Sequence, residues 1–173
     1  MTATRIRAAA LRVLADDPAA GMGTIAAEAG VGRATLYRHF ASREDLIEGL
    51  REQIRAEFRA LVSETNLGQG DPLEALERFV EGLWELRDRY VVIAPPRDED
   101  AERRAAVLWR PVHRLVARAQ EAGEIDADLA PSWVAASLRA LVRAAGAEVD
   151  AGRLARRDAP ALVVRQLLQG AKP

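Results

Sequence analysis

The stretch between Glu28 and Glu44 contains no acidic residue and concentrates side chains that bind phosphates and base edges. Its cationic residues are Arg33, Arg38, His39 and Arg43. An arginine fork pairs with phosphate oxygens or with guanine, a hydroxyl group binds phosphate, and a threonine methyl group contacts thymine. Because Thr35 and Tyr37 lie in the same stretch, its residue types favour recognition of a nucleic acid.

Residues 24 to 40 have the pattern of two short helices joined by a tight turn at Gly30. This plan is a helix-turn-helix, whose second helix enters the major groove of DNA while the first crosses the backbone. Leu36 and Phe40 are four residues apart and face the core, whereas Tyr37 projects outward. The alternative for Tyr37 is ordinary packing in a small helical domain, and the whole pattern argues against it.

The residues GVGRATLYRHFASREDLI closely resemble the recognition-helix signature of TetR-family regulators. The resemblance is strong over residues 5 to 50. It implies a three-helix DNA-binding head, a helical body for ligand binding and dimerisation, and a repressor that a small molecule releases from its operator. The DNA-contacting positions that it assigns to this sequence are Arg33, Ala34, Thr35, Tyr37 and His39. Arg43 matches the basic residue that opens the next helix, and we add Arg38 to the expected contact surface.

Several residues depart from this pattern or admit two interpretations. Gly32 stands where the family usually places a capping residue, which costs the recognition helix about 0.5 kcal/mol or less. Gly21 and Gly23 loosen the start of the preceding helix in the same way. Among the N-terminal arginines we expect Arg5 to contact phosphate and Arg12 to lie on a solvated helix face.

Composition and residue spacing predict helices in the rest of the chain as well. Alanine, leucine and arginine dominate, aromatic residues make up only 5% of the 173 residues, and no strand pattern occurs. We therefore expect an all-α protein of about nine helices, with residues 1–46 as the DNA-binding domain and 47–173 as the body. Pro111 should kink or split one helix, and we expect other helices at residues 131–149 and from Pro160 onward.

The helix at residues 131–149 has unusually smooth, alanine-rich sides that permit close helix approach. The last helix is expected to find little else in its own chain against which to bury its apolar face. We therefore predict a homodimer in which both helices pack against their copies as a four-helix bundle. A two-fold dimer in turn predicts a palindromic operator in double-stranded DNA.

A small-molecule site is expected in the body, where aromatic and polar side chains recur at helical spacing. Trp84 and Asp88 are four residues apart, and Trp109 and His113 are spaced in the same way across Pro111. These four residues are the candidate ligand-binding residues. The alternative is that they fill the core, and for Trp84, Trp109 and Trp133 a core position is the more common role of a tryptophan.

The sequence lacks the marks of other protein classes. Cysteine is absent, no cluster of metal ligands occurs, and no phosphate loop or nucleophile elbow is present, so we expect no metal, no cofactor and no enzyme activity. No apolar run approaches the roughly 20 residues that span a bilayer, and no signal-peptide core is visible, so we expect a cytoplasmic protein. The remaining alternative is a helical protein-interaction adaptor without DNA binding.

Overall fold

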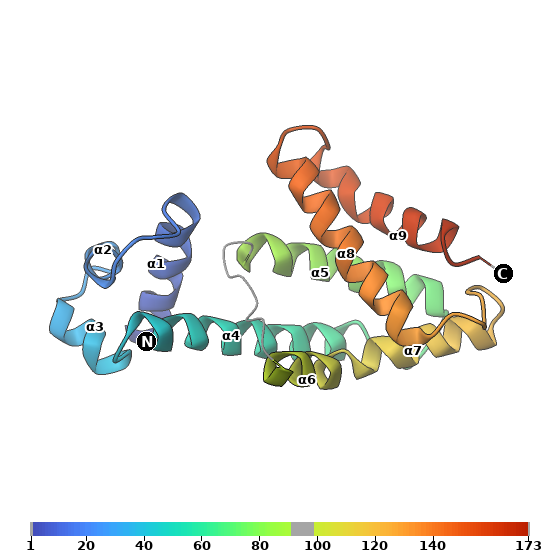
Figure 1. The fold of residues 1–173 in the computed structure, drawn as a ribbon, viewed down its shortest axis with the longest axis horizontal. Coiled ribbons are helices and arrows are strands. Elements are labelled where there is room, and N and C mark those ends of the chain that lie inside the picture. Colours follow the sequence, from blue (N-terminus) through green and yellow to red (C-terminus); the bar gives the residue numbers. More distant parts are fainter. Residues whose placement is uncertain (1, 91–98, 173) are drawn as a thin grey trace. The chain divides into compact units, whose positions relative to one another are not determined.

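The computed structural model describes residues 2–90 and 99–172, except for the side chains of residues 88–90, 99, 101 and 102. The described residues form nine α-helices, one short 3-10 helix and no β-strand, which confirms the all-α prediction (Figure 1). The helices are α1 (Thr2–Asp16), α2 (Met22–Glu28), α3 (Arg33–His39), α4 (Arg43–Glu64), α5 (Pro72–Tyr90), α6 (Glu99–Leu108), α7 (Arg110–Glu121), α8 (Pro131–Asp150) and α9 (Ala159–Gln169).

The helices divide into two compact units, and the division falls within α4. The first unit contains the residues up to Glu57, and the second contains Phe58–Asp88 and the described residues from Glu99 onward. The division of the chain between residues 46 and 47 stays a prediction.

Each helix of the first unit contributes apolar side chains to a buried core. Helix α1 presents one buried face because its apolar residues recur three and four positions apart. Complete burial of a leucine such as Leu36 contributes about 2 kcal/mol, and Leu36 is fully buried. The buried core side chains of this unit are Ile6, Ala9, Ala10, Leu14, Ile25, Ala26, Leu36, Phe40, Leu46 and Leu50.

The second unit contains two antiparallel helices, α8 and α9, that pack side by side (Figure 1). The apolar residues Val163, Val164 and Leu167 of α9 are buried. The expectation that α9 needs a second copy to bury its apolar face is therefore wrong, because α8 of the same chain covers that face.

The predicted break at Pro111 is confirmed, since α6 ends at Leu108 and α7 begins at Arg110. Trp109 is the N-cap of α7, and Pro111 lies in the first turn of that helix. A proline is tolerated there because the amide hydrogens of the first turn have no acceptor within the helix. The backbone amides of Trp109 and His113 both keep hydrogen bonds, to Ala105 and Trp109 respectively, so the chain turns here without losing them.

The loop before α5 is held by two devices. Asp71 caps α5 by accepting a hydrogen bond from the backbone amide of Glu74 at 2.9 Å. Arg118 of α7 donates hydrogen bonds to the carbonyl oxygens of Leu67 and Gly70 at 2.7 and 2.5 Å. These contacts fix the entry of α5, the helix that carries Trp84.

Candidate DNA interface and candidate ligand site

The helix-turn-helix consists of α2, α3 and the turn between them. Gly30 ends α2 with a φ of +62°, a backbone conformation that glycine adopts without strain. The amide of Val31 then donates to the carbonyl of Ala26 at 3.0 Å, which closes the turn. Leu36 and Phe40 are buried, as predicted, and they hold α3 against the core of the unit.

The opposite side of α3 is open to solvent. Tyr37 is 50% exposed, an unusual exposure for so large a side chain in the described part of the molecule. Thr35 is half-buried, and the exposed neighbours on the same helix are Arg33, Ala34, Arg38 and His39. The short helix thus presents one phenol, one hydroxyl group and several cations together, which suits contact with phosphates and base edges.

Gly23 makes room for Arg33. A Cβ atom built on Gly23 lies 2.8 Å from Nη2 of Arg33 and 3.2 Å from its Nε, which is closer than carbon and nitrogen tolerate. The guanidinium group of Arg33 therefore lies against the first turn of α2. The sequence indicated only that Gly23 loosens α2; in the structure this glycine also leaves room for the guanidinium group of an expected DNA-contacting side chain.

Arg43 holds a loop in place. Its Nη2 donates to the carbonyl oxygen of Pro18 at 2.7 Å, and its Nε donates to that of Ala20 at 3.4 Å. These bonds join the start of α4 to the loop between α1 and α2. The sequence predicted that Arg43 binds DNA phosphate, and the structure adds a positioning role within the protein.

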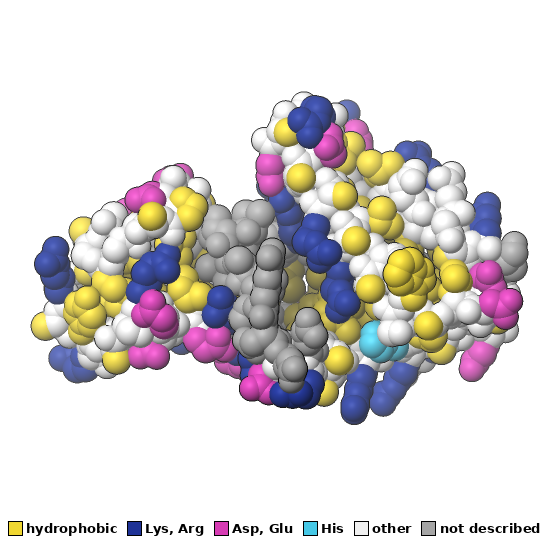
Figure 2. Space-filling model, in the orientation of Figure 1, with side chains coloured by type: hydrophobic (Ala, Val, Ile, Leu, Met, Phe, Trp, Pro, Cys, Tyr) yellow, Lys and Arg dark blue, Asp and Glu magenta, His cyan; other side chains and the backbone are white. Residues whose placement is uncertain are grey.

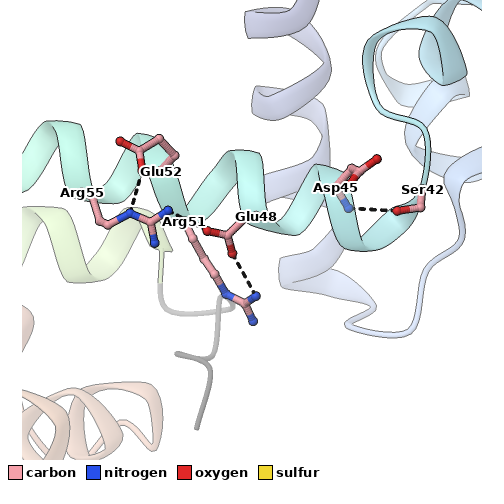
Figure 3. Close-up of polar contacts among 6 residues, drawn as sticks. All are labelled: Ser42, Asp45, Glu48, Arg51, Glu52 and Arg55. Atoms are coloured by element: carbon pink, nitrogen blue, oxygen red, sulfur yellow. Dashed lines mark hydrogen bonds and ion pairs between the residues drawn. The ribbon is translucent and has the colours of Figure 1, made fainter. Parts of the chain in front are cut away.

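The two helix starts near the recognition helix differ in their capping. Gly32 is the N-cap of α3 and provides no side-chain hydrogen bond, as expected. Ser42 caps α4, because its Oγ accepts a hydrogen bond from the amide of Asp45 at 3.0 Å (Figure 3). The long helix is thereby the better anchored of the two at its first turn.

The first half of α4 carries an ion-pair network along one side (Figure 3). Arg55 pairs with Glu48 at 2.6 Å and with Glu52 at 2.7 Å, and Arg51 pairs with Glu48 at 3.4 Å. The hydrogen bond from Arg55 is the main cause that holds the pKa of Glu48 below its usual value, and burial opposes it. Individual exposed pairs contribute little stability, but together they favour the helical form of α4.

Arg5 and Arg12 of α1 both have partners within the first unit. Nη2 of Arg5 donates to the carbonyl oxygen of Gly30 at 3.5 Å, and Nε of Arg12 pairs with Glu28 at 3.0 Å. Arg12 and Glu28 are both well exposed, so this pair is a weak surface contact. The expected phosphate contact of Arg5 stays a prediction.

In the second unit, three aromatic rings form one cluster. Phe58, Phe79 and Trp109 come from α4, α5 and the N-cap of α7, and their ring centroids lie 5.1 to 6.1 Å apart. All three rings are buried. The sequence pointed to Trp109 alone, because the two phenylalanines meet it only through the tertiary fold.

Arg139 of α8 lies over the Trp109 ring of this cluster. Its Cζ lies 5.0 Å from the centroid of the Trp109 ring, a cation–π distance. His113 lies one turn after Trp109, and its pKa is lowered first by burial and then by the positive charge of Arg139. The structure places Arg139 near both Trp109 and His113, an arginine for which the sequence gave no signal, and their role in ligand binding stays a prediction.

Trp84 is buried in α5, and its Nε1 has no hydrogen-bond partner. Arg87 lies over its ring at 5.4 Å and pairs with Asp150 of α8 at 2.6 Å. Among the described residues the indoles of Trp84 and Trp109 make no ring contact with each other. The side chain of Asp88 lies outside the described residues.

Trp133 corrects the expectation that the tryptophans belong to the core, since it is 64% exposed. The buried stripe of α8 begins one residue later, at Val134, and continues through Leu138 and Val142. A one-residue step turns a side chain about 100° around a helix. Trp133 therefore lies on a different side of α8 from the core residues.

The described part of the chain lacks both a metal site and a membrane-spanning helix. It contains no group of three or more histidine, aspartate or glutamate side chains placed to hold a metal ion. None of its helices is both long enough and apolar enough to cross a membrane.

Comparison with known proteins gives a consistent result. Residues 6–50 match the family described as bacterial regulatory proteins, tetR family. A stretch of 78 residues is 40% identical to the HTH-type transcriptional repressor LfrR of Mycolicibacterium smegmatis. A stretch of 76 residues is 32% identical to the HTH-type transcriptional regulator NfxB of Pseudomonas aeruginosa.

These two stretches cover 45% and 44% of this chain and 41% and 40% of the two relatives, so the sequence match spans about two fifths of each relative's length. The structural match is longer. The crystal structure of the TetR-like regulator LfrR in complex with proflavine superposes with a TM-score of 0.79 and 26% identity, covering 99% of this chain and 98% of LfrR. A TetR-family regulator from Rhodococcus sp., at 22% identity and a TM-score of 0.77 over 98% of both chains, shares the fold.

Proposed function

We propose that this chain, whose residues 6–50 match the TetR family of bacterial regulatory proteins and whose helices have the fold of TetR-like regulators, is a sequence-specific transcriptional repressor released from DNA by a small molecule. The observation that carries the proposal is the exposed face of α3. Tyr37 on that face is 50% exposed, and the cations around it lie on a helix-turn-helix. Such a helix is built to enter a major groove.

Within this function, the side chains on α3 read base edges and set the register on DNA. The proposed contact residues are Arg33, Ala34, Thr35, Tyr37, Arg38 and His39. Arg43 adds a phosphate contact through the part of its guanidinium that its bonds to Pro18 and Ala20 leave available. Phosphate contacts place the head, and base contacts give sequence preference.

We propose that the repressor is a homodimer that binds a palindrome. The support is the exposed side of α8, where Trp133 is 64% exposed and where Ala140 and Ala144 are also exposed. Apolar side chains line this side in Figure 2. Small residues let a second helix approach closely, and half-sites would recur about one DNA turn or a multiple of it apart, roughly 34 to 36 Å per turn.

The effector site is proposed around the aromatic cluster of the second unit. Trp109 and His113 supply an aromatic and a polar side chain there. We also include Trp84 of α5 and Asp88, which follows Trp84 by one turn of that helix. Support comes from LfrR, the similar protein whose structure holds proflavine. An effector that releases DNA must prefer the non-binding conformation, so it raises the melting temperature and weakens operator binding together.

The experiment that tests this function is selection of bound fragments from bacterial genomic DNA with the purified protein. Enrichment of a palindromic sequence supports the repressor, which acts in the cytoplasm where chromosomal DNA lies. Binding without sequence preference, or no DNA binding at all, would favour the helical adaptor.

A further inference from the structure

Two tryptophan–arginine stacks in the second unit differ in one respect. In the first, Arg87 lies over Trp84 and is neutralised by Asp150 at 2.6 Å. In the second, Arg139 lies over Trp109, yet no carboxylate of the described residues pairs with it. Arg139 also donates none of the hydrogen bonds found in the described part of the chain. The second stack therefore holds a half-buried cation without a counter-charge.

A second cation makes the site more positive. Arg143 follows Arg139 by one turn of α8, and its charge adds to burial in lowering the pKa of Arg139. Like charges four residues apart on a helix destabilise it. Arginine side chains are visible along one edge of α8 in Figure 2. Neither arginine forms an ion pair with any described residue of this chain, so nothing in the described structure offsets their repulsion.

The third helix around the site supplies no negative charge either. His113 of α7 faces Arg139 closely enough for the two to interact electrostatically, and the pKa of His113 is lowered by burial and by that charge. At neutral pH the imidazole is uncharged and can donate one hydrogen bond. The flat guanidinium of Arg139, held against an aromatic ring, is oriented to donate two parallel bonds to a carboxylate.

We propose that the effector of this protein is an aromatic carboxylate whose anionic group binds Arg139 and Arg143 while its ring packs beside Trp109. The inference rests on the proposed function in that it assumes an effector site in the second unit, and it adds the charge and the class of the ligand. A cationic ligand is disfavoured beside Arg139 and Arg143, because the two arginines would repel it and no carboxylate of the described residues pairs with either of them.

The test uses three naphthalene probes of the same shape: naphthalene-2-carboxylate, naphthalene-2-carboxamide and 2-naphthylmethylammonium. Calorimetric titration of the full chain is expected to give about tenfold tighter binding of the carboxylate than of the carboxamide, since one charge-assisted bond of this kind is lost. In Arg139→Gln the ratio should fall, and in the double variant Arg139→Gln, Arg143→Gln it should fall to near one. Arg165→Gln on α9 removes the same charge from an exposed position and should leave the ratio unchanged.

Several outcomes would overturn the proposal. These are equal or tighter binding of the carboxamide, tighter binding of the ammonium probe, and the absence of carboxylate binding at millimolar concentration. Sequence-specific DNA binding is measured in the same samples without any probe. If the protein does not bind DNA specifically, the proposed repressor function is contradicted, but the proposal about the ligand class is not. Binding of the carboxylate also raises the pKa of His113 in proton NMR, a change that an unrelated binding site would not produce.

Discussion

The guanidinium group of Arg139 lies over the Trp109 ring at 5.0 Å and also acts on His113, one turn after Trp109 in α7. Burial and this positive charge both disfavour the imidazolium form, so the pKa of His113 lies below 6.5. Arg139→Gln should raise the pKa of His113 toward 6.5 without reaching it, because burial remains. Proton NMR of the two histidines, with His39→Gln for assignment, measures this directly.

The same shift sets a pH dependence. Between the folded-state pKa of His113 and about 6.5, the unfolded chain binds more protons than the folded chain. The free energy of unfolding therefore falls as the pH falls through this window, and His113→Gln removes that part of the fall. An unchanged pKa of His113 in Arg139→Gln would show that the two groups do not interact.

Gly23→Ala is predicted to weaken DNA binding through Arg33. The added methyl group meets the guanidinium of Arg33 at 2.8 Å and must displace it. Alanine is the better helix former by about 1 kcal/mol, so the melting temperature should not fall. Operator binding should weaken by about 1 kcal/mol or more, because Arg33 is proposed to contact a base.

A double-mutant cycle provides the control for this prediction. In an Arg33→Ala background, Gly23→Ala should have no further effect on operator affinity. Additive losses would mean that Gly23 acts on DNA binding by some route other than Arg33.

Arg43 should influence both stability and DNA affinity. Arg43→Ala removes the bonds to Pro18 and Ala20 and is expected to cost about 1 kcal/mol of unfolding free energy. It should also reduce the slope of log affinity against log salt by about one, without a change of base preference. Arg43→Lys keeps the positive charge, so the salt slope should stay unchanged. It loses the pair of hydrogen bonds to Pro18 and Ala20, so the stability should still fall. A shift in base preference would contradict the phosphate assignment.

Dimerisation is predicted to depend on α8. Ala144→Arg places a charge on the exposed side of α8 that carries Trp133 and Ala140, and it should produce monomers at micromolar concentration in sedimentation. Val107→Arg is the matched control, because Val107 is 58% exposed on α6 and lies outside the proposed interface. A wild-type monomer, or an equal effect of both variants, would rule out this interface.

The parts of the structure that depend on neighbouring residues could be predicted from the sequence. The turn at Gly30 and the break before Pro111 are fixed within one or two helical turns. The buried and exposed faces of α3 also follow from spacing, since Leu36 and Phe40 are buried and Tyr37 is not.

Features that depend on contacts between distant helices could not be predicted. In the sequence Arg139 cannot be distinguished from a surface arginine, because its contact with Trp109 forms only when α8 packs in the folded protein. Trp133 lies on one of two apolar stripes of α8, and only the packing of α7 and α9 decides which stripe is buried. Likewise, the part that Gly23 plays depends on the position of Arg33 after folding.

The central claim is that α3 reads a specific DNA sequence, and operator affinity of Tyr37→Ala tests it most directly. Tyr37 is half-exposed and faces away from the core, so its loss should leave the melting temperature nearly unchanged. Fluorescence anisotropy at fixed salt, with the palindrome obtained by fragment selection and with a scrambled duplex, should show affinity for the palindrome reduced by about 1 to 3 kcal/mol and affinity for the scrambled duplex little changed. Equal affinity of wild type and Tyr37→Ala for the palindrome, or wild-type binding that does not distinguish the two duplexes, would contradict the account.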